Sequence, residues 1–138
     1  MNLLRAVVVL AFCLGCLSSP RAGEPLQFNR DIRPILSDNC FACHGFDSNK
    51  RKADLRLDVF SDALLKDEIL VPGSPEKSAL YQRINASDHD EVMPPQDSGK
   101  ALTPGQKTKL HNWIAQGAKF EKHWAYIPAK RPRVPGVL

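Results

Sequence analysis

The sequence predicts a small, mainly α domain built of three to four short helices joined by long loops. Apolar residues recur at helical spacing from Phe28 onward, and a second such run opens with a capping box at Thr103. The length of 138 residues suits one domain, and 11 prolines with 8 glycines indicate many turns. The composition, 43% apolar and 25% charged, is that of a folded globular protein rather than a disordered chain.

An amphipathic helix is expected to open the folded domain. Its apolar face would consist of residues at i, i+4, i+7 and i+8, namely Phe28, Ile32, Ile35 and Leu36. Asn29 and Asp31 are the candidate caps, and a cap at Asp31 leaves Pro34 in the first turn, where its missing N–H does no harm. The helix should run into the cysteine pair that begins at Cys40 and should end near Gly45.

Two shorter helical segments are expected in the middle of the chain. Apolar residues alternate at positions 55–59, but the run is too short to predict a sheet, and a helical turn is expected at residues 61–65. Ser74 and Pro75 then signal a helix, as its cap and first helical residue. The apolar face of that helix would be Leu80, Tyr81 and Ile84. Residues 85–100 are polar and should form a loop.

The last predicted helix starts at the capping box of Thr103 and Gln106 and stops at Gly117. It places Leu110, Trp113 and Ile114 on one face, which we expect to cross and pack on the first helix. The domain would then span residues 28–120. Residues 121–138 are rich in proline and are expected to be a tail or the start of a linker.

The N-terminus has the layout of a secretory signal peptide over residues 1–22. Arg5 precedes an unbroken apolar run at residues 6–17, and small and polar residues follow. The run is shorter than the ~20 residues that a membrane span needs, so export to the periplasm or cell envelope is expected. The alternatives are an uncleaved membrane anchor, a buried helix, and a lipid anchor on Cys16.

The charge and the polar residues exclude several function classes. The formal net charge of +4 is small, and no basic block with interleaved aromatics indicates a nucleic-acid partner. The largest basic group, Lys130, Arg131 and Arg133, stands among prolines, as in a solvated linker. No Ser–His–Asp set, carboxylate pair or glycine-rich phosphate loop is present, so no catalytic residue is predicted and hydrolase or kinase chemistry has no support.

Cys40, Cys43 and His44 form a C-x-x-C-H motif, the signature of covalent c-type haem attachment. Thiols three residues apart on a helix face the same side, so both can reach the vinyl groups at one edge of a porphyrin. His44 would be the proximal iron ligand, with its other ring nitrogen oriented by a carbonyl group. A cofactor of this size would also organise the long loops. The sequence therefore predicts one haem c, bound through Cys40 and Cys43.

Three other interpretations of the cysteine pair stay open. A thioredoxin-type dithiol site would need a βαβ setting, which the pattern lacks. A zinc site needs a second pair of ligands, and His89, His111 and His123 do not have paired spacing. A disulfide between Cys40 and Cys43 would close a short ring and would stabilise the fold little.

Met93 is the predicted distal ligand of the iron. It is the only methionine beyond Met1, and it lies in a polar stretch beside Pro94 and Pro95. A methionine that only fills a core rarely has such neighbours. His/Met ligation raises the reduction potential of haem and suits electron transfer. The alternative distal ligand is His89, which would give bis-His ligation.

Several stretches, taken in order, make the chain resemble the planctomycete-type cytochrome c domain over roughly residues 28–126. The matching stretches are residues 28–45, 55–58, 71–78, 93–95 and 113–117. The resemblance implies a small cytochrome c-like fold, thioether bonds at Cys40 and Cys43, a proximal His44 and a distal Met93. In this family the domain often opens a longer exported protein, and the segment from His123 onward looks like the passage into such a further domain.

The expected function is one-electron transfer by an exported c-type cytochrome to or from an unidentified redox partner protein. The domain is expected to be monomeric, and to be an electron carrier or electron-transfer module rather than a stand-alone enzyme. Two other functions remain as alternatives. One is the haem module of a larger oxidoreductase or peroxidase, which an open sixth position on the iron would favour. The other is a haem-bearing sensor or interaction domain.

Overall fold

The computed structural model describes residues 25–126, 128 and 129. The predicted signal segment at residues 1–22, with Cys13 and Cys16, lies outside the described residues, as does most of the predicted tail. Within the described part no helix is both long and apolar enough to cross a membrane.

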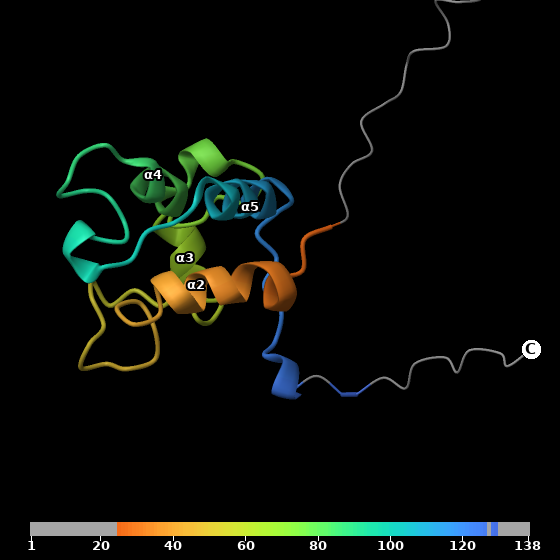
Figure 1. Cartoon of the computed structure of the whole chain (residues 1–138). Helices are drawn as coiled ribbons and strands as arrows, with labels where there is room; N and C mark the ends of the chain where they lie inside the picture. The colour runs from red at the N-terminus through yellow and green to blue at the C-terminus, as the bar shows by residue number, and fades with distance from the viewer. Residues whose placement is uncertain (1–24, 127, 130–138) are drawn as a thin grey trace, which may run out of the picture.

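The described chain is helical and contains no strand, which confirms the predicted fold class. The α-helices are α2 (Arg33–Asn39), α3 (Asp62–Lys66), α4 (Ala79–Asn85) and α5 (Pro104–Ala115). Four single-turn elements lie between and beside them: the π-helix η1 (Phe28–Ile32) and the 3-10 helices η2 (Pro75–Lys77), η3 (Gln96–Ser98) and η4 (Trp124–Tyr126). Long loops join these elements around one core (Figure 1).

The first helix differs from the prediction at both ends. It begins as a π-helical turn, and the Asp31 carboxylate accepts a hydrogen bond from the Gln27 backbone N–H at 2.9 Å rather than capping the α-helix. It ends at Asn39 and not near Gly45. The N–H groups of the next two residues both donate to the Leu36 carbonyl, at 2.8 and 3.0 Å. The hydrogen-bond register therefore slips by one residue, and the α-helix cannot continue.

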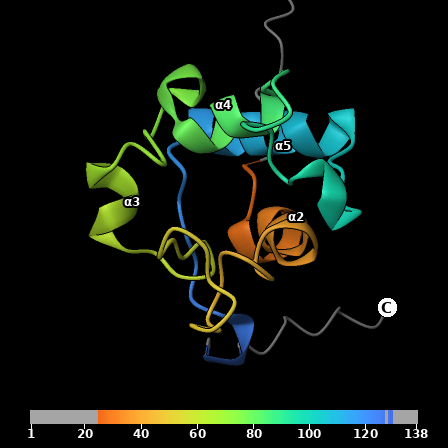
Figure 2. The same ribbon diagram turned by 90° about the vertical axis from the view of Figure 1, so that its left-hand side faces the viewer.

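Helix α5 crosses η1, as predicted for the first and last helices (Figures 1 and 2). An aromatic cluster joins them: the Phe28 ring centroid lies 5.7 Å from that of Trp113 and 4.5 Å from that of Phe120. The Trp113 Nε1–H donates to the Lys119 carbonyl at 3.0 Å, so the buried indole has no unpaired polar atom. The fully buried Ile114 and Leu110 extend this core along α5.

Both ends of α5 agree with the prediction. Thr103 and Gln106 form a reciprocal capping box, with N···O distances of 3.2 and 2.8 Å. At the other end Gly117 has a φ of +101°, a conformation that strains any residue with a side chain. This turn directs residues 118–122 back along η1. Asn29 holds them there, because its backbone N–H donates to Glu121 Oε2 and its side-chain amide to the Lys122 carbonyl.

The helix predicted from Ser74 is split in two. Ser74 makes no capping hydrogen bond, and the extended backbone of Ser78 separates η2 from α4. The reason is the burial of the Ser78 hydroxyl, which accepts from the Val71 N–H at 2.9 Å and donates to the Ser74 carbonyl at 3.1 Å. One side chain thereby closes the turn at residues 71–78. Residues 55–59 form no strand, consistent with the short alternation there.

We predict that Ser78→Ala destabilises the domain by about 1–3 kcal/mol, because it leaves the Val71 N–H beside a buried site without a partner. The Ser74 carbonyl loses one bond but still accepts from the Lys77 N–H at 3.1 Å. Chemical denaturation of the full chain measures this. Ser37→Ala, at an exposed serine of α2, is the control and should change the free energy of unfolding far less. Equal losses in the two variants would show that the Ser78 hydroxyl does not hold the turn.

Candidate functional site

The sequence predicted that the C-x-x-C-H motif lies on the first helix. The motif instead lies in the turn directly after α2. The N–H groups of Cys43 and His44 both donate to the Cys40 carbonyl, at 3.1 and 2.8 Å. This single turn keeps the two cysteines together even though the helix has ended. Both thiols are free; Cys40 is partly buried against the core and Cys43 is exposed.

The backbone of the motif is held by a segment that folds back against it, residues 51–57, which we call the return segment. Four consecutive carbonyl groups, from residue 43 to residue 46, each accept one hydrogen bond from it. The donors are Lys52 N to Cys43 O (2.8 Å), Leu57 N to His44 O (2.9 Å), Arg51 Nε to Gly45 O (3.1 Å) and Arg51 Nη2 to Phe46 O (3.2 Å). No motif in the sequence indicates this role of Arg51.

Gly45 closes the motif because no side chain fits there. A Cβ atom at this position would lie 2.3 Å from the Phe41 carbonyl oxygen, well inside van der Waals contact. The backbone of Gly45 is thus packed directly against the backbone of Phe41. This close packing fixes the position of the neighbouring His44 backbone.

The His44 ring carries the most unusual polar atom of the structure. Its Nδ1 is the only buried side-chain nitrogen or oxygen, among the described residues, that has no hydrogen-bond partner. Burial lowers the pKa of His44, and the nearby backbone of Lys52 opposes this with a smaller effect. The imidazole is therefore neutral at neutral pH and available as a metal ligand. A buried polar group without a partner needs an explanation, and a functional role such as metal ligation is one.

The surroundings of Cys40 disfavour two of the other interpretations. Burial raises the pKa of Cys40 to about 11, with a smaller contribution from Cys43, so the thiol stays protonated at neutral pH. A reactive dithiol site needs the opposite shift. Within the part of the chain that the structure describes, no three His, Cys, Asp or Glu side chains come together as a metal site, which disfavours zinc.

Met93 is partly buried in the long loop after α4. Its backbone N–H donates to the Arg83 carbonyl at 3.0 Å, and the Arg83 guanidinium donates to the Glu91 carbonyl at 3.4 Å. Helix α4 therefore holds this loop at two points. The loop and the motif turn lie at the same end of the domain, on the left in Figure 1 and toward the viewer in Figure 2.

The histidines outside the motif have other surroundings. The His89 side chain is 69% exposed, with its Nδ1 3.3 Å from a carboxylate oxygen of Asp90. The His111 side chain is 37% exposed and packs edge-on against Tyr81, with ring centroids 5.2 Å apart. His123 lines a pocket at the other side of the domain.

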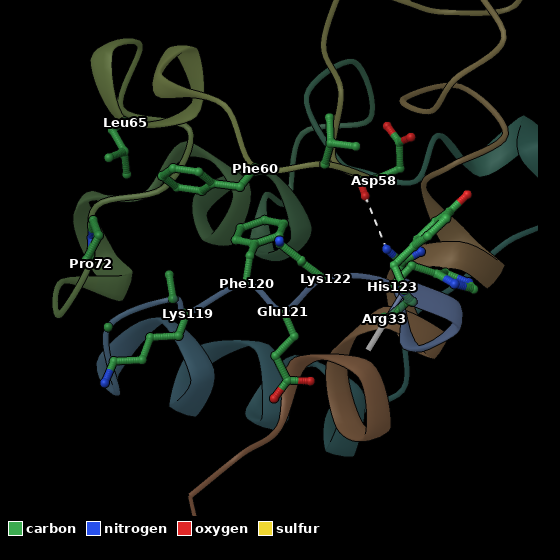
Figure 3. A pocket seen from close by; sticks show the side chains of 14 residues that line it. Arg33, Asp58, Phe60, Leu65, Pro72, Lys119, Phe120, Glu121, Lys122 and His123 are labelled. Carbon is green, nitrogen blue, oxygen red and sulfur yellow. Dashed lines mark hydrogen bonds between the residues drawn. The ribbon is translucent and has the colours of Figure 1, made fainter. Parts of the chain in front are cut away.

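That pocket has a volume of about 910 Å³ and lies between the loop at residues 58–60 and the segment that follows α5 (Figure 3). Arg33 borders it, and its guanidinium carbon lies 5.6 Å from the Phe28 ring centroid and 6.0 Å from that of Phe41. The lining includes none of the four predicted cofactor residues, Cys40, Cys43, His44 and Met93. This pocket and the predicted site are therefore different places.

Comparison with known proteins identifies the part of the chain that holds the motif. The planctomycete cytochrome C family model matches residues 40–97. Over this segment the chain is similar to the planctomycete cytochrome C family. No curated protein and no solved structure matches the chain. The match confirms the resemblance seen in the sequence, and it indicates a haem-binding cytochrome domain. The matched part includes all four predicted cofactor residues and the whole return segment.

A haem group fits the donor set of the motif turn and of the loop that carries Met93. The motif turn offers two free thiols and an imidazole with a lowered pKa in one turn of backbone, and the loop that carries Met93 lies at the same end of the domain (Figure 1). Those are the side chains by which proteins hold haem c.

Gly45→Ala is predicted to destabilise the cytochrome domain by about 1–3 kcal/mol, the usual cost of forcing an atom into packed space. It should also lower the haem bound per chain, because the clash moves the backbone beside His44. Gly105→Ala is the matched control, since the nearest atom to its Cβ would be 4.0 Å away. Thermal unfolding and haem absorbance per protein measure both effects. Equal behaviour of the two variants would contradict the prediction.

Proposed function

We propose that the protein is an exported c-type cytochrome that transfers single electrons through one covalently bound haem. Cys40 and Cys43 would hold the porphyrin through thioether bonds, and His44 and Met93 would be the axial ligands. The observation that carries the proposal is the buried, unpartnered Nδ1 of His44 in a C-x-x-C-H turn within the matched segment.

The motif turn supports two thioether bonds to one porphyrin edge. The hydrogen bonds of Cys43 and His44 to the Cys40 carbonyl keep the thiols on one turn of chain. Free thiols are required for this chemistry, and both cysteines are free. The partial burial of Cys40 and the exposure of Cys43 suit a haem with one edge inside the protein and one edge at the surface.

The environment of His44 supports its role as the proximal ligand. With Nε2 on the iron, Nδ1 would stay inside the protein as a hydrogen-bond donor, and the Lys52 backbone is the neighbouring acceptor. Such a bond fixes the plane of the ring and increases its strength as a ligand. His44 needs no deprotonation to bind, because its lowered pKa keeps the ring neutral.

The loop that carries Met93 supports a role for this residue as the ligand in the sixth coordination position of the iron. Two hydrogen bonds to Arg83 hold this loop on α4, and the ring of His89, the alternative ligand, is directed to solvent beside Asp90. Bound haem iron supplies a one-electron couple between its two oxidation states. A protein that fills both axial positions with its own side chains leaves none for peroxide or a signalling gas, so electron transfer is the favoured function.

The site of action is proposed from the sequence alone. The layout of residues 1–22 is that of a secretory signal, so the cytochrome would work in the periplasm or cell envelope with a redox protein as its partner.

Covalent attachment predicts a c-type absorption spectrum that survives denaturation. The full chain, produced in a host with cytochrome c maturation enzymes, should show the c-type band of the pyridine complex after denaturation and reduction. Cys40→Ser/Cys43→Ser should lose the band, because a haem without thioether bonds dissociates from the denatured chain and does not give the c-type spectrum. A folded, exported protein without the band would refute the haem proposal.

Met93→Ala should lower the reduction potential and abolish the weak red charge-transfer band of a sulfur–iron bond, because His/Met ligation raises the potential. Potentiometric titration with visible spectroscopy measures both. His89→Ala is the control and should change neither, since His89 is directed to solvent. If His89→Ala alone altered the spectrum, the ligation would be bis-His. If neither variant altered it, the iron would have an open position, as in a peroxidase or sensor.

A further inference from the structure

Arg51 is far less exposed than a loop arginine usually is. Its side chain is 18% exposed, and its guanidinium bonds in three directions. Nε donates to the Gly45 carbonyl at 3.1 Å, Nη2 to the Phe46 carbonyl at 3.2 Å and Nη1 to Asp54 Oδ1 at 3.0 Å. The planar guanidinium therefore links the backbone directly after the motif to the return segment.

We propose that Arg51 is a positioning residue that sets the orientation of the His44 ring relative to the haem. The inference rests on the proposed function. It assigns to this side chain the link between the C-x-x-C-H turn and the return segment, through the carbonyl groups of Gly45 and Phe46.

The position of Arg51 in the chain supports this role. Lys52 follows it directly, and the Lys52 backbone both donates to the Cys43 carbonyl and lies beside the His44 ring. By fixing the two carbonyls that follow His44, Arg51 fixes the distance between the ring and the Lys52 backbone. The hydrogen bond that would orient the imidazole is formed across that distance.

The return segment also needs an external tether, because it turns through strained backbone. Ala53 and Asp54 have φ values of 53° and 49°, in the left-handed region that residues with a side chain rarely adopt. Strain of this kind persists only where surrounding contacts compensate for it. Arg51 supplies such contacts on both sides, to the motif and to the Asp54 carboxylate.

Charge alone does not explain the arrangement. A lysine would keep the positive charge but would have one donor centre in place of the fork, and it could not reach both carbonyls and the carboxylate together. Arg51→Lys therefore separates positioning from electrostatics. Arg56→Lys is the matched control: Arg56 is in the same segment and pairs with Asp58. Its hydrogen bonds to that carboxylate do not involve the Gly45 and Phe46 carbonyls that Arg51 holds.

The test uses the haem-loaded full chain and three measurements: haem bound per chain, reduction potential, and the proton NMR shifts of the haem methyl groups in the oxidised protein. The spread of the methyl shifts depends on the orientation of the axial imidazole. Arg51→Lys should change that spread, shift the potential and lower the haem content. Arg56→Lys should match the unaltered protein in all three. A methyl spectrum of Arg51→Lys identical to that of Arg56→Lys would overturn the inference.

A milder variant covers the case in which Arg51→Lys does not fold. Asp54 is 93% exposed, so Asp54→Asn should fold and should loosen only the third contact of the guanidinium. It should change the methyl spread in the same direction by a smaller amount, and no change would refute the role of Arg51. Absence of covalent haem in the unaltered protein would instead refute the proposed function, which keeps the two failures distinct.

Discussion

A domain made of short helices and long loops must find hydrogen-bond partners for loop backbone that no sheet provides. The cost of leaving a buried carbonyl or N–H unpaired is high, so this requirement organises the whole molecule. The clearest case is the run of four carbonyls from Cys43 to Phe46, which all accept hydrogen bonds from the return segment. Elsewhere Gly73 N–H donates to the Ile114 carbonyl and Met93 N–H to the Arg83 carbonyl. Each loop is thus attached to a helix or to another loop at a defined point.

The parts of the fold that the sequence predicted well are those set by local physics. The capping box at Thr103 and the glycine that ends α5 act through neighbouring backbone groups, and the apolar face of that helix follows from its period alone. The crossing of α5 with the start of the first helix followed from the same reasoning, because each helix has one apolar face to bury.

The predictions of element boundaries were wrong where tertiary contacts determine where a helix ends or breaks. The first helix ends at Asn39 because two N–H groups compete for the Leu36 carbonyl, and nothing in the local pattern shows this. The break before α4 depends on a hydroxyl of Ser78 that reaches back to residue 71. The cysteines and His44 could be identified from their spacing, because that chemistry is local. Arg51 could not, because its partners become visible only when the chain folds back on itself.

The bonds of Asn29 to residues 121 and 122 bring the entry and the exit of the described chain to one side of the domain. The motif turn and the loop after α4 lie at the opposite end (Figure 1). A domain attached through the segment before residue 25 or after residue 126 would therefore be held on the side opposite the motif turn. The end that carries the cysteines would then face away from the attachment point. A partner could approach this end without contact with the attached segment.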